Sequence, residues 1–171
     1  MNKVFEMPTR PILEALVARD QLMVSKTRQK KLSAWIFKTL TMSALVAYPQ
    51  FADVPNAAIA RLRQTSGRPF ANARLWIGQH GEAAVYPEGV PEQQSKPEMW
   101  SDGDLPHSNG LLLPNLYIVM WVSQDGRWSA FMEHPWWGTF IRQVFPFERA
   151  FEWPLNSQMD ADIIATITTR W

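Results

Sequence analysis

Apolar side chains recur at helical spacing through the first part of the chain, and three such segments can be separated. The first follows Thr9, whose hydroxyl is suited to cap a helix over 10–19. The second follows Ser25, a further capping residue, and runs over 25–47 with its apolar positions three and four residues apart. A third pattern covers 55–65. The sequence therefore predicts three helices before residue 74.

Beyond residue 74 the apolar runs become short and rich in aromatic and β-branched residues, which is typical of strands. The runs 75–77 and 83–86 flank Gln-His-Gly and predict a hairpin. Residues 87–110 show no periodicity and are rich in Pro, Gly, Ser and acidic residues, so they predict a long loop. The segment 139–145 predicts a further strand.

The clearest strand pattern is the apolar run over 116–123, and Asp-Gly follows it at 125–126. Asp-Gly is a preferred two-residue hairpin turn, so 127–133 is predicted to return as the partner strand. Near the C-terminus, Ser157 and Asp160 resemble a capping box that opens a helix, although the residues that follow suit a strand nearly as well.

Helices first and strands after define an α+β fold, with N-terminal helices packed on a mostly antiparallel sheet. The chain has 171 residues, of which 46% are hydrophobic and 19% charged. Neither half has an apolar core of its own, so a single domain over 1–171 is expected.

The charge of the chain is divided unevenly. Residues 1–74 carry twelve Lys and Arg against four acidic residues, a net charge of +8. Residues 75–171 carry five basic against twelve acidic residues, a net charge of −7, together with eight of the nine tryptophans. This asymmetry predicts a basic helical part suited to polyanions and an acidic, Trp-rich strand part.

The basic half supplies a candidate nucleic-acid surface, because phosphate neutralisation needs long cationic side chains clustered on one face. A solvated helix face, or a docking patch for the acidic half, would give the same pattern. The residues concerned are Lys26, Arg28, Lys30, Lys31, Arg61 and Arg63.

The chain has no cysteine, which fits a reducing cytoplasm and removes thiolate chemistry. Its most apolar stretch, 32–48, has 17 residues and contains Lys38. A membrane span needs about 20 mostly apolar residues, and a central Lys costs roughly 2.5–3.5 kcal/mol on insertion scales. We therefore expect a buried helix and no transmembrane span, with peripheral contact to the inner membrane left open by the basic residues upstream.

Two groups of residues are candidates for a metal site and a catalytic site. Asp102, Asp104 and His107 have side chains that can hold Mg²⁺ or Mn²⁺, although the spacing is common in acidic loops. A second set combines the end of the strand predicted over 127–133 with an arginine of the strand predicted over 139–145. It is suited to proton transfer and to stabilising negative charge, with strand-end capping as the alternative for the first two residues. That set comprises Glu133, His134 and Arg142.

Tryptophans near these residues offer a further interpretation. Trp136 and Trp137, and the pair Trp121 and Trp128 across the predicted hairpin, could stack on nucleobases. Aromatic residues at alternate strand positions are more often part of a core.

The segment Leu116–Trp153 (LYIVMWVSQDGRWSAFMEHPWWGTFIRQVFPFERAFEW), together with the basic helical front, resembles plasmid fertility-inhibition proteins of the oncogenic-suppression type. These proteins block transfer of DNA or protein through type IV secretion systems. The resemblance implies a ParB/sulfiredoxin-like fold, ATP and Mg²⁺ as cofactors, and ATPase and DNase activity. The ParB-type Gly-Glu-Arg-Arg box is absent, and Arg68 and Arg127, each in a Gly-Arg pair, are its substitutes and the expected cofactor-binding residues. The sulfiredoxin-type cysteine is also missing.

The sequence thus favours a plasmid factor that acts on DNA and on the conjugation or secretion machinery. One alternative is a non-enzymatic inhibitor that binds its target through the acidic Trp-rich face. The other is a DNA-binding regulator. The length and composition of 48–54 count against a helix-turn-helix in that case.

Overall fold

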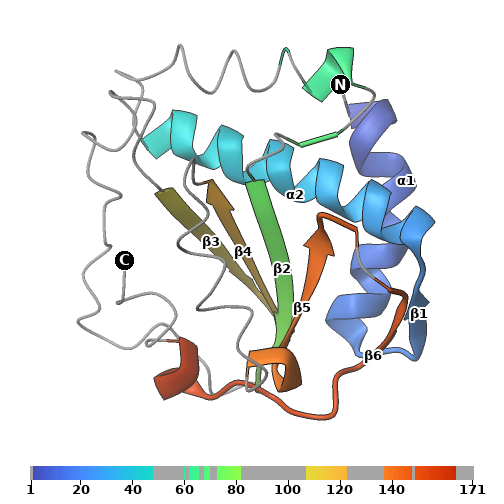
Figure 1. The fold of residues 1–171 in the computed structure, drawn as a ribbon, viewed down its shortest axis with the longest axis vertical. Helices are drawn as coiled ribbons and strands as arrows, with labels where there is room; N and C mark the ends of the chain where they lie inside the picture. Colours follow the sequence, from blue (N-terminus) through green and yellow to red (C-terminus); the bar gives the residue numbers. More distant parts are fainter. Residues whose placement is uncertain are drawn as a thin grey trace.

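The computed structural model describes residues 2–47, 60, 62–65, 68–69, 73–81, 107–122, 137–147 and 149–164. These residues form an α+β arrangement in which two helices lie on one face of an antiparallel sheet (Figure 1). The predicted fold class is confirmed. Figure 1 shows α2 crossing the face of the sheet. Helix α1 lies near the start of α2, at the opposite end of that helix from β3.

Helix α1 (Asn2–Ala18) begins eight residues before the predicted start. Thr9, which we expected to cap it, lies buried inside the helix and donates its hydroxyl to the Lys31 carbonyl of α2 over 3.3 Å. The helix ends where Arg19 adopts a positive φ of 61° and the Asp20 N–H bonds back to the Ala15 carbonyl at 2.9 Å. This closing turn is a Schellman motif, which satisfies carbonyls that the helix end would otherwise leave open.

Helix α2 (Lys26–Ala47) agrees with the prediction at both ends. Ser25 precedes it, and its hydroxyl accepts from the Arg28 N–H at 3.4 Å. The face turned to the sheet is apolar and buried, with Leu32, Ile36 and Leu40 in the core. Among the described residues, no helix has the combination of length and apolar content that crossing a membrane requires.

The main sheet has the strand order β3-β4-β2-β5, and every neighbouring pair is antiparallel. A second sheet joins β1 to β6 beside the start of α2. A single 3₁₀ turn, η2, precedes β5. The bounds are β1 Leu22–Val24, β2 Ala73–Gln79, β3 His107–Leu113, β4 Leu116–Val122, η2 Trp137–Thr139, β5 Ile141–Phe145 and β6 Phe151–Trp153.

The strands at 75–77 and 116–122 have other partners, so both predicted hairpins are wrong, and the runs expected to return, 83–86 and 127–133, lie outside the described residues. β4 pairs along its whole length with β3 on one edge and with β2 on the other, so no edge remains for 127–133. The hairpin instead precedes β4, and its turn holds Asn115 at a φ of 62°. In the same way, β4 and β5 occupy both edges of β2, which excludes 83–86 as a partner for 75–77.

Two further boundaries differ from expectation. Residues 107–110, placed in the long loop, belong to β3, whose Asn and Gly residues hide the strand pattern. Near the C-terminus the helical turn over 161–164 begins at Asp160, whose carboxylate accepts the Ile163 N–H at 2.8 Å. Ser157 therefore lies ahead of the cap instead of forming it. Most of the third predicted helix lies outside the described residues, and its end over 62–64 is helical.

The two faces of the main sheet bury different side chains. The face beneath α1 and α2 is largely aliphatic and includes Leu75, Ile77 and Ile118. The opposite face carries an aromatic cluster against which Met159 and Ile164 pack, formed by Trp76, Tyr117, Trp121 and Trp137 with Val119 and Ile141. Alternation along each strand explains the division, since successive side chains point to opposite faces.

Candidate nucleic-acid interface

Four cationic residues lie in the first two turns of α2. The side chains of Lys26, Lys30 and Lys31 are exposed, and Arg28 is half-buried. The first turn contains no acidic residue, so the helix supplies these cations with no local counter-charge. The structure therefore keeps together four of the six residues predicted to bind nucleic acid.

The acidic residues of the helices form ion pairs at other positions. Glu14 pairs with Arg10 within α1 at 2.7 Å, and Glu6 pairs with the largely buried Lys38 across the two helices. Within the described part of the chain, no carboxylate lies at ion-pair distance from Lys26, Lys30 or Lys31. The positive charge at the start of α2 is therefore not neutralised by those carboxylates.

The Arg10–Glu14 pair shows how a carboxylate partner changes the pKa of an exposed cation. The Glu14 carboxylate accepts a hydrogen bond from the guanidinium and attracts it, and both effects raise the pKa of Arg10 above its ordinary value. Arg10 is fully solvent-exposed, so the pair contributes little to stability.

A buried amide fixes the start of α2 against two distant segments. Gln29 donates from Nε2 to the Val24 carbonyl at 3.2 Å and to the Arg149 carbonyl at 3.1 Å. Arg28 donates from Nη1 to the Met23 carbonyl at 2.6 Å. The helix start, β1 and the segment before β6 therefore form one rigid corner of the fold.

Arg149 is a residue that sequence reasoning missed. Its backbone meets Gln29 at the start of α2, 120 positions away along the chain, and its side chain is exposed. No local pattern marks such a residue, because only the packing of β6 beside β1 brings it there. We call Lys26, Arg28, Lys30, Lys31 and Arg149 the basic corner.

The remaining predicted cations lie at a different place. Arg63 is exposed at the helical end of the third helix, Arg68 is exposed just after it, and the neighbouring Leu62 is buried in the core. Figure 1 places 62–65 near the beginning of α1, well apart from the start of α2. The structure thus divides the predicted basic surface in two, and Arg61 lies outside the described residues.

The predicted catalytic set is only partly visible. Arg142 lies on β5 opposite Ile77 and is half-buried. A Cβ built on Gly138 would lie 3.4 Å from its Nη1, so the guanidinium lies beside η2. Glu133 and His134 lie outside the described residues, as does Arg127 of the cofactor-binding pair, so the set stays a prediction.

The predicted metal site is likewise untested. Asp102 and Asp104 lie outside the described residues, and only the backbone of His107 is described, at the start of β3 opposite Val122. Over the described ranges, no three potential ligands from His, Asp and Glu come together.

The tryptophans are core residues wherever the structure describes their burial, apart from the half-buried Trp35. Trp121 packs edge-on against Trp76, with ring centroids 4.9 Å apart at 66°, and it is 3% exposed. Trp137 is equally buried. Neither ring has a free face on which a base could stack, so the core interpretation of these two residues is confirmed. Trp128 and Trp136 lie outside the described residues.

Comparisons of this chain with protein-family models, curated proteins and solved structures find no match.

Proposed function

We propose that the chain binds DNA through the basic corner and acts as a plasmid fertility-inhibition factor that blocks conjugative transfer through a type IV secretion system. The supporting observation is the group of exposed cations, Lys26, Lys30 and Lys31, with no carboxylate partner among the described residues. The likeness of Leu116–Trp153 to the oncogenic-suppression proteins supplies the cellular setting.

Helix stability does not account for these cations. The N-terminus of a helix carries partial positive charge, so Lys26 and Arg28 in the first turn oppose the dipole of α2. The same positive end of the helix dipole attracts phosphate. Together with Lys30, Lys31 and Arg149 it forms a surface that suits an anion with several charges along its length, which is the chemistry of a DNA backbone.

Binding of this kind is governed by phosphate neutralisation, so it is strong at low salt and depends weakly on base sequence. A protein that covers the backbone of a transferred strand would oppose its passage through the secretion channel. ATPase and DNase activity, with ATP and Mg²⁺ as cofactors, stays a prediction, because most of the residues expected to carry it lie outside the described ranges.

The test compares two triple variants with the same change in net charge. Lys26→Gln/Lys30→Gln/Lys31→Gln removes three charges from the basic corner. Arg10→Gln/Arg63→Gln/Arg68→Gln removes three exposed charges elsewhere. DNA affinity is measured against salt concentration for both variants. We expect the first variant to lower the slope of log K against log salt by about 0.9 for each DNA phosphate that the protein no longer neutralises, and the second to retain the slope.

The same variants are then expressed in a plasmid donor, and transfer frequency is scored. Inhibition of transfer should be lost with the first variant and retained with the second. If the unmodified chain binds no DNA, or if both variants bind as it does, the proposal is wrong. A parallel assay of supercoiled and single-stranded DNA with Mg²⁺ and ATP, including Glu133→Ala and Arg142→Ala, tests the predicted enzymatic activity separately.

The interaction-protein alternative has less support. It relied on Trp136 and Trp137 as a docking face, and Trp137 is buried in the aromatic cluster. A target bound through the acidic half would also show no response to the basic-corner variant, so the transfer assay distinguishes the two hypotheses.

A further inference from the structure

Gln29 is a buried amide at the start of α2. It is 0% exposed, although the residues on either side of it, Arg28 and Lys30, reach solvent. Its backbone N–H bonds to the Ser25 carbonyl at 2.8 Å, which fixes the residue in the first turns of the helix. Burying an amide costs free energy unless hydrogen bonds replace those it made to water, a cost that an apolar side chain would not have. Packing alone therefore does not explain an amide at this position.

The hydrogen bonds of the Gln29 side chain connect three parts of the chain. Its Nε2 donates to the Val24 carbonyl at 3.2 Å and to the Arg149 carbonyl at 3.1 Å. A primary amide nitrogen has two hydrogens and a carbonyl oxygen only accepts, so these two bonds use both hydrogens. Val24 belongs to β1, and Arg149 lies ahead of β6. The amide therefore joins α2 to β1 and to the segment before β6.

Arg149 lies just beyond the contact between β1 and β6. It follows β5, which ends at Phe145, and precedes β6, which begins at Phe151. The pairing of β1 with β6 starts at Val24 and Phe151, so it does not include Arg149. Figure 1 shows β6 beside β1, next to the start of α2. The Gln29 amide extends this contact and holds the Arg149 backbone against α2, while the arginine side chain is exposed.

We infer, on the basis of the proposed DNA-binding function, that Gln29 is a positioning residue of the basic corner. It is buried and contacts no phosphate itself. By holding the Arg149 backbone at the start of α2, it brings an arginine from a distant segment into the same surface as Lys26 and Lys30. DNA phosphates are then bound by cations from two segments at once. Without the amide, Arg149 is released from α2, whereas the lysines keep their places because the helix itself holds them.

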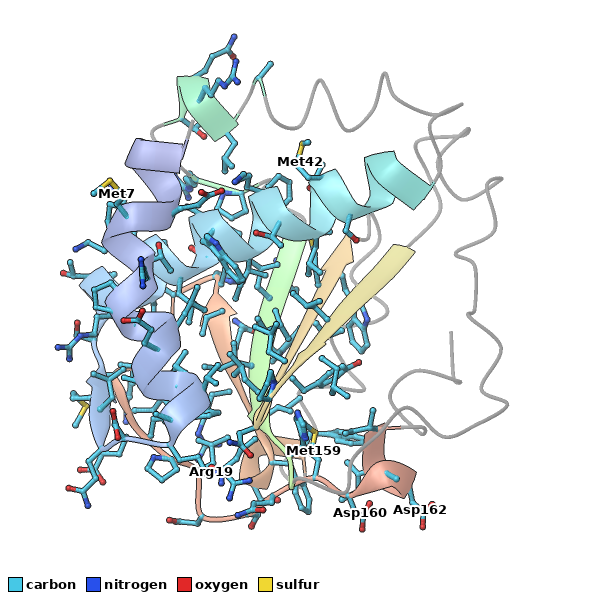
Figure 2. The ribbon with its side chains drawn as sticks, turned by 180° about the vertical axis from the view of Figure 1, so that it is seen from behind. Met7, Arg19, Met42, Met159, Asp160 and Asp162 are labelled. Carbon is cyan, nitrogen blue, oxygen red and sulfur yellow. The ribbon has the colours of Figure 1, made fainter. Side chains whose placement is uncertain are left out.

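The geometry can be tested without DNA. The chain has no cysteine, so Arg149→Cys gives a single attachment point for a nitroxide spin label. We expect the label to broaden the amide NMR signals of Lys26 and Lys30 and to leave that of Met42 sharp. Met42 lies farther along α2 (Figure 2), about 24 Å beyond Lys26 along the helix axis. With Gln29→Met, which has a similar shape and no donor, the broadening at the two lysines should weaken. Equal broadening with and without the amide would overturn the positioning role.

The second test measures affinity for duplex DNA against salt concentration. Gln29→Met leaves the charge of the chain unchanged. We nevertheless expect it to lower the slope of log K against log salt by about 0.9, as Arg149→Gln does, because each variant loses one phosphate contact. The double variant should also lose about 0.9, and not about 1.8. Lys30→Gln should lower the slope by the same amount whether or not the amide is present, because α2 holds Lys30.

A buried amide at another place provides the matched control. Gln79 is 3% exposed and ends β2, so Gln79→Met should retain the slope. A slope that Gln29→Met leaves unchanged, or a loss of about 1.8 in the double variant, would contradict the positioning role. If Gln29→Met does not fold, Gln29→Asn replaces it, because its amide is one methylene shorter and does not reach both carbonyls. If the unmodified chain binds no DNA, the proposed function fails, and the spin-label measurement still decides whether Gln29 places Arg149.

Discussion

The start of α2 and the end of β2 are both rich in polar side chains, which are mostly exposed at the first place and buried at the second. At the end of β2, Gln79 and His80 are buried, and each makes hydrogen bonds to backbone groups. At the start of α2, Lys26, Lys30 and Lys31 are exposed, with no carboxylate partner among the described residues. The comparison separates polar groups that stabilise the fold from charges that remain available to a partner.

Burial explains the difference. A polar group withdrawn from water must find a partner or cost free energy, so Gln79 and His80 bond to backbone groups at the end of β2. An exposed ammonium is already solvated, and a surface ion pair would add little. The basic corner therefore keeps its charge at little cost to stability, and that charge can be neutralised by a phosphate.

The largest effect on stability is expected at Trp153, which is buried like Gln79 and His80. Its side chain is 1% exposed, and its Nε1 donates to the Leu16 carbonyl at 3.0 Å. Trp153→Ala should lower the free energy of unfolding by about 3–5 kcal/mol in chemical denaturation. Trp153→Phe retains most of the volume and should cost less. Equal penalties for both variants would place the whole effect in the hydrogen bond.

A smaller effect is expected at Gln79. Its Oε1 accepts the buried N–H of Leu155 at 3.0 Å, and that N–H would lose its partner in Gln79→Ala. The free energy of unfolding should fall by about 1–3 kcal/mol. The matched control is Gln21→Ala, since Gln21 is exposed and its loss should cost no more than about 0.5 kcal/mol. Similar penalties for the two would mean that burial does not distinguish these amides.

The smallest effect on stability is expected at the basic corner, where the triple variant Lys26→Gln/Lys30→Gln/Lys31→Gln should leave unfolding nearly unchanged. Removing Lys26 from the first turn of α2 relieves its repulsion from the helix dipole, which is worth about 0.3–1 kcal/mol in favour of the fold. Thermal and chemical denaturation at low salt measure the change. A destabilisation of more than about 1 kcal/mol would show that these lysines stabilise the fold, and the contrast with the buried polar groups at the end of β2 would fail.

Local sequence patterns were sufficient for α2, β2, β4 and β5, and insufficient for β1, β3 and β6 and for the pairing of the strands. Ser25 and the apolar spacing after it predicted α2 at both ends, because capping and helical periodicity act within a few residues. The apolar run of β4 was equally clear. Its partners were predicted wrongly, because Asp-Gly at 125–126 is a local hairpin signal whereas β2 and β3 are the strands that pair with β4.

The candidate site divides in the same way. The sequence placed Lys26, Arg28, Lys30 and Lys31 together, since residues within two turns of one helix share its start. It did not show that Arg149 joins them, or that Arg63 and Arg68 lie elsewhere. The predicted catalytic and metal-binding residues stay predictions, because most of them lie outside the described residues.

The sequence by itself determined α2, the apolar runs of β2 and β4, and the separation of charge between the two halves, since each depends on neighbouring residues. Tertiary structure decided which cation finds a carboxylate, as Lys38 does with Glu6 across α1 and α2, and which histidine faces two carbonyls, as His80 does. Such interactions join residues many positions apart. They form only where burial of the core compensates for the entropy lost in bringing distant segments together.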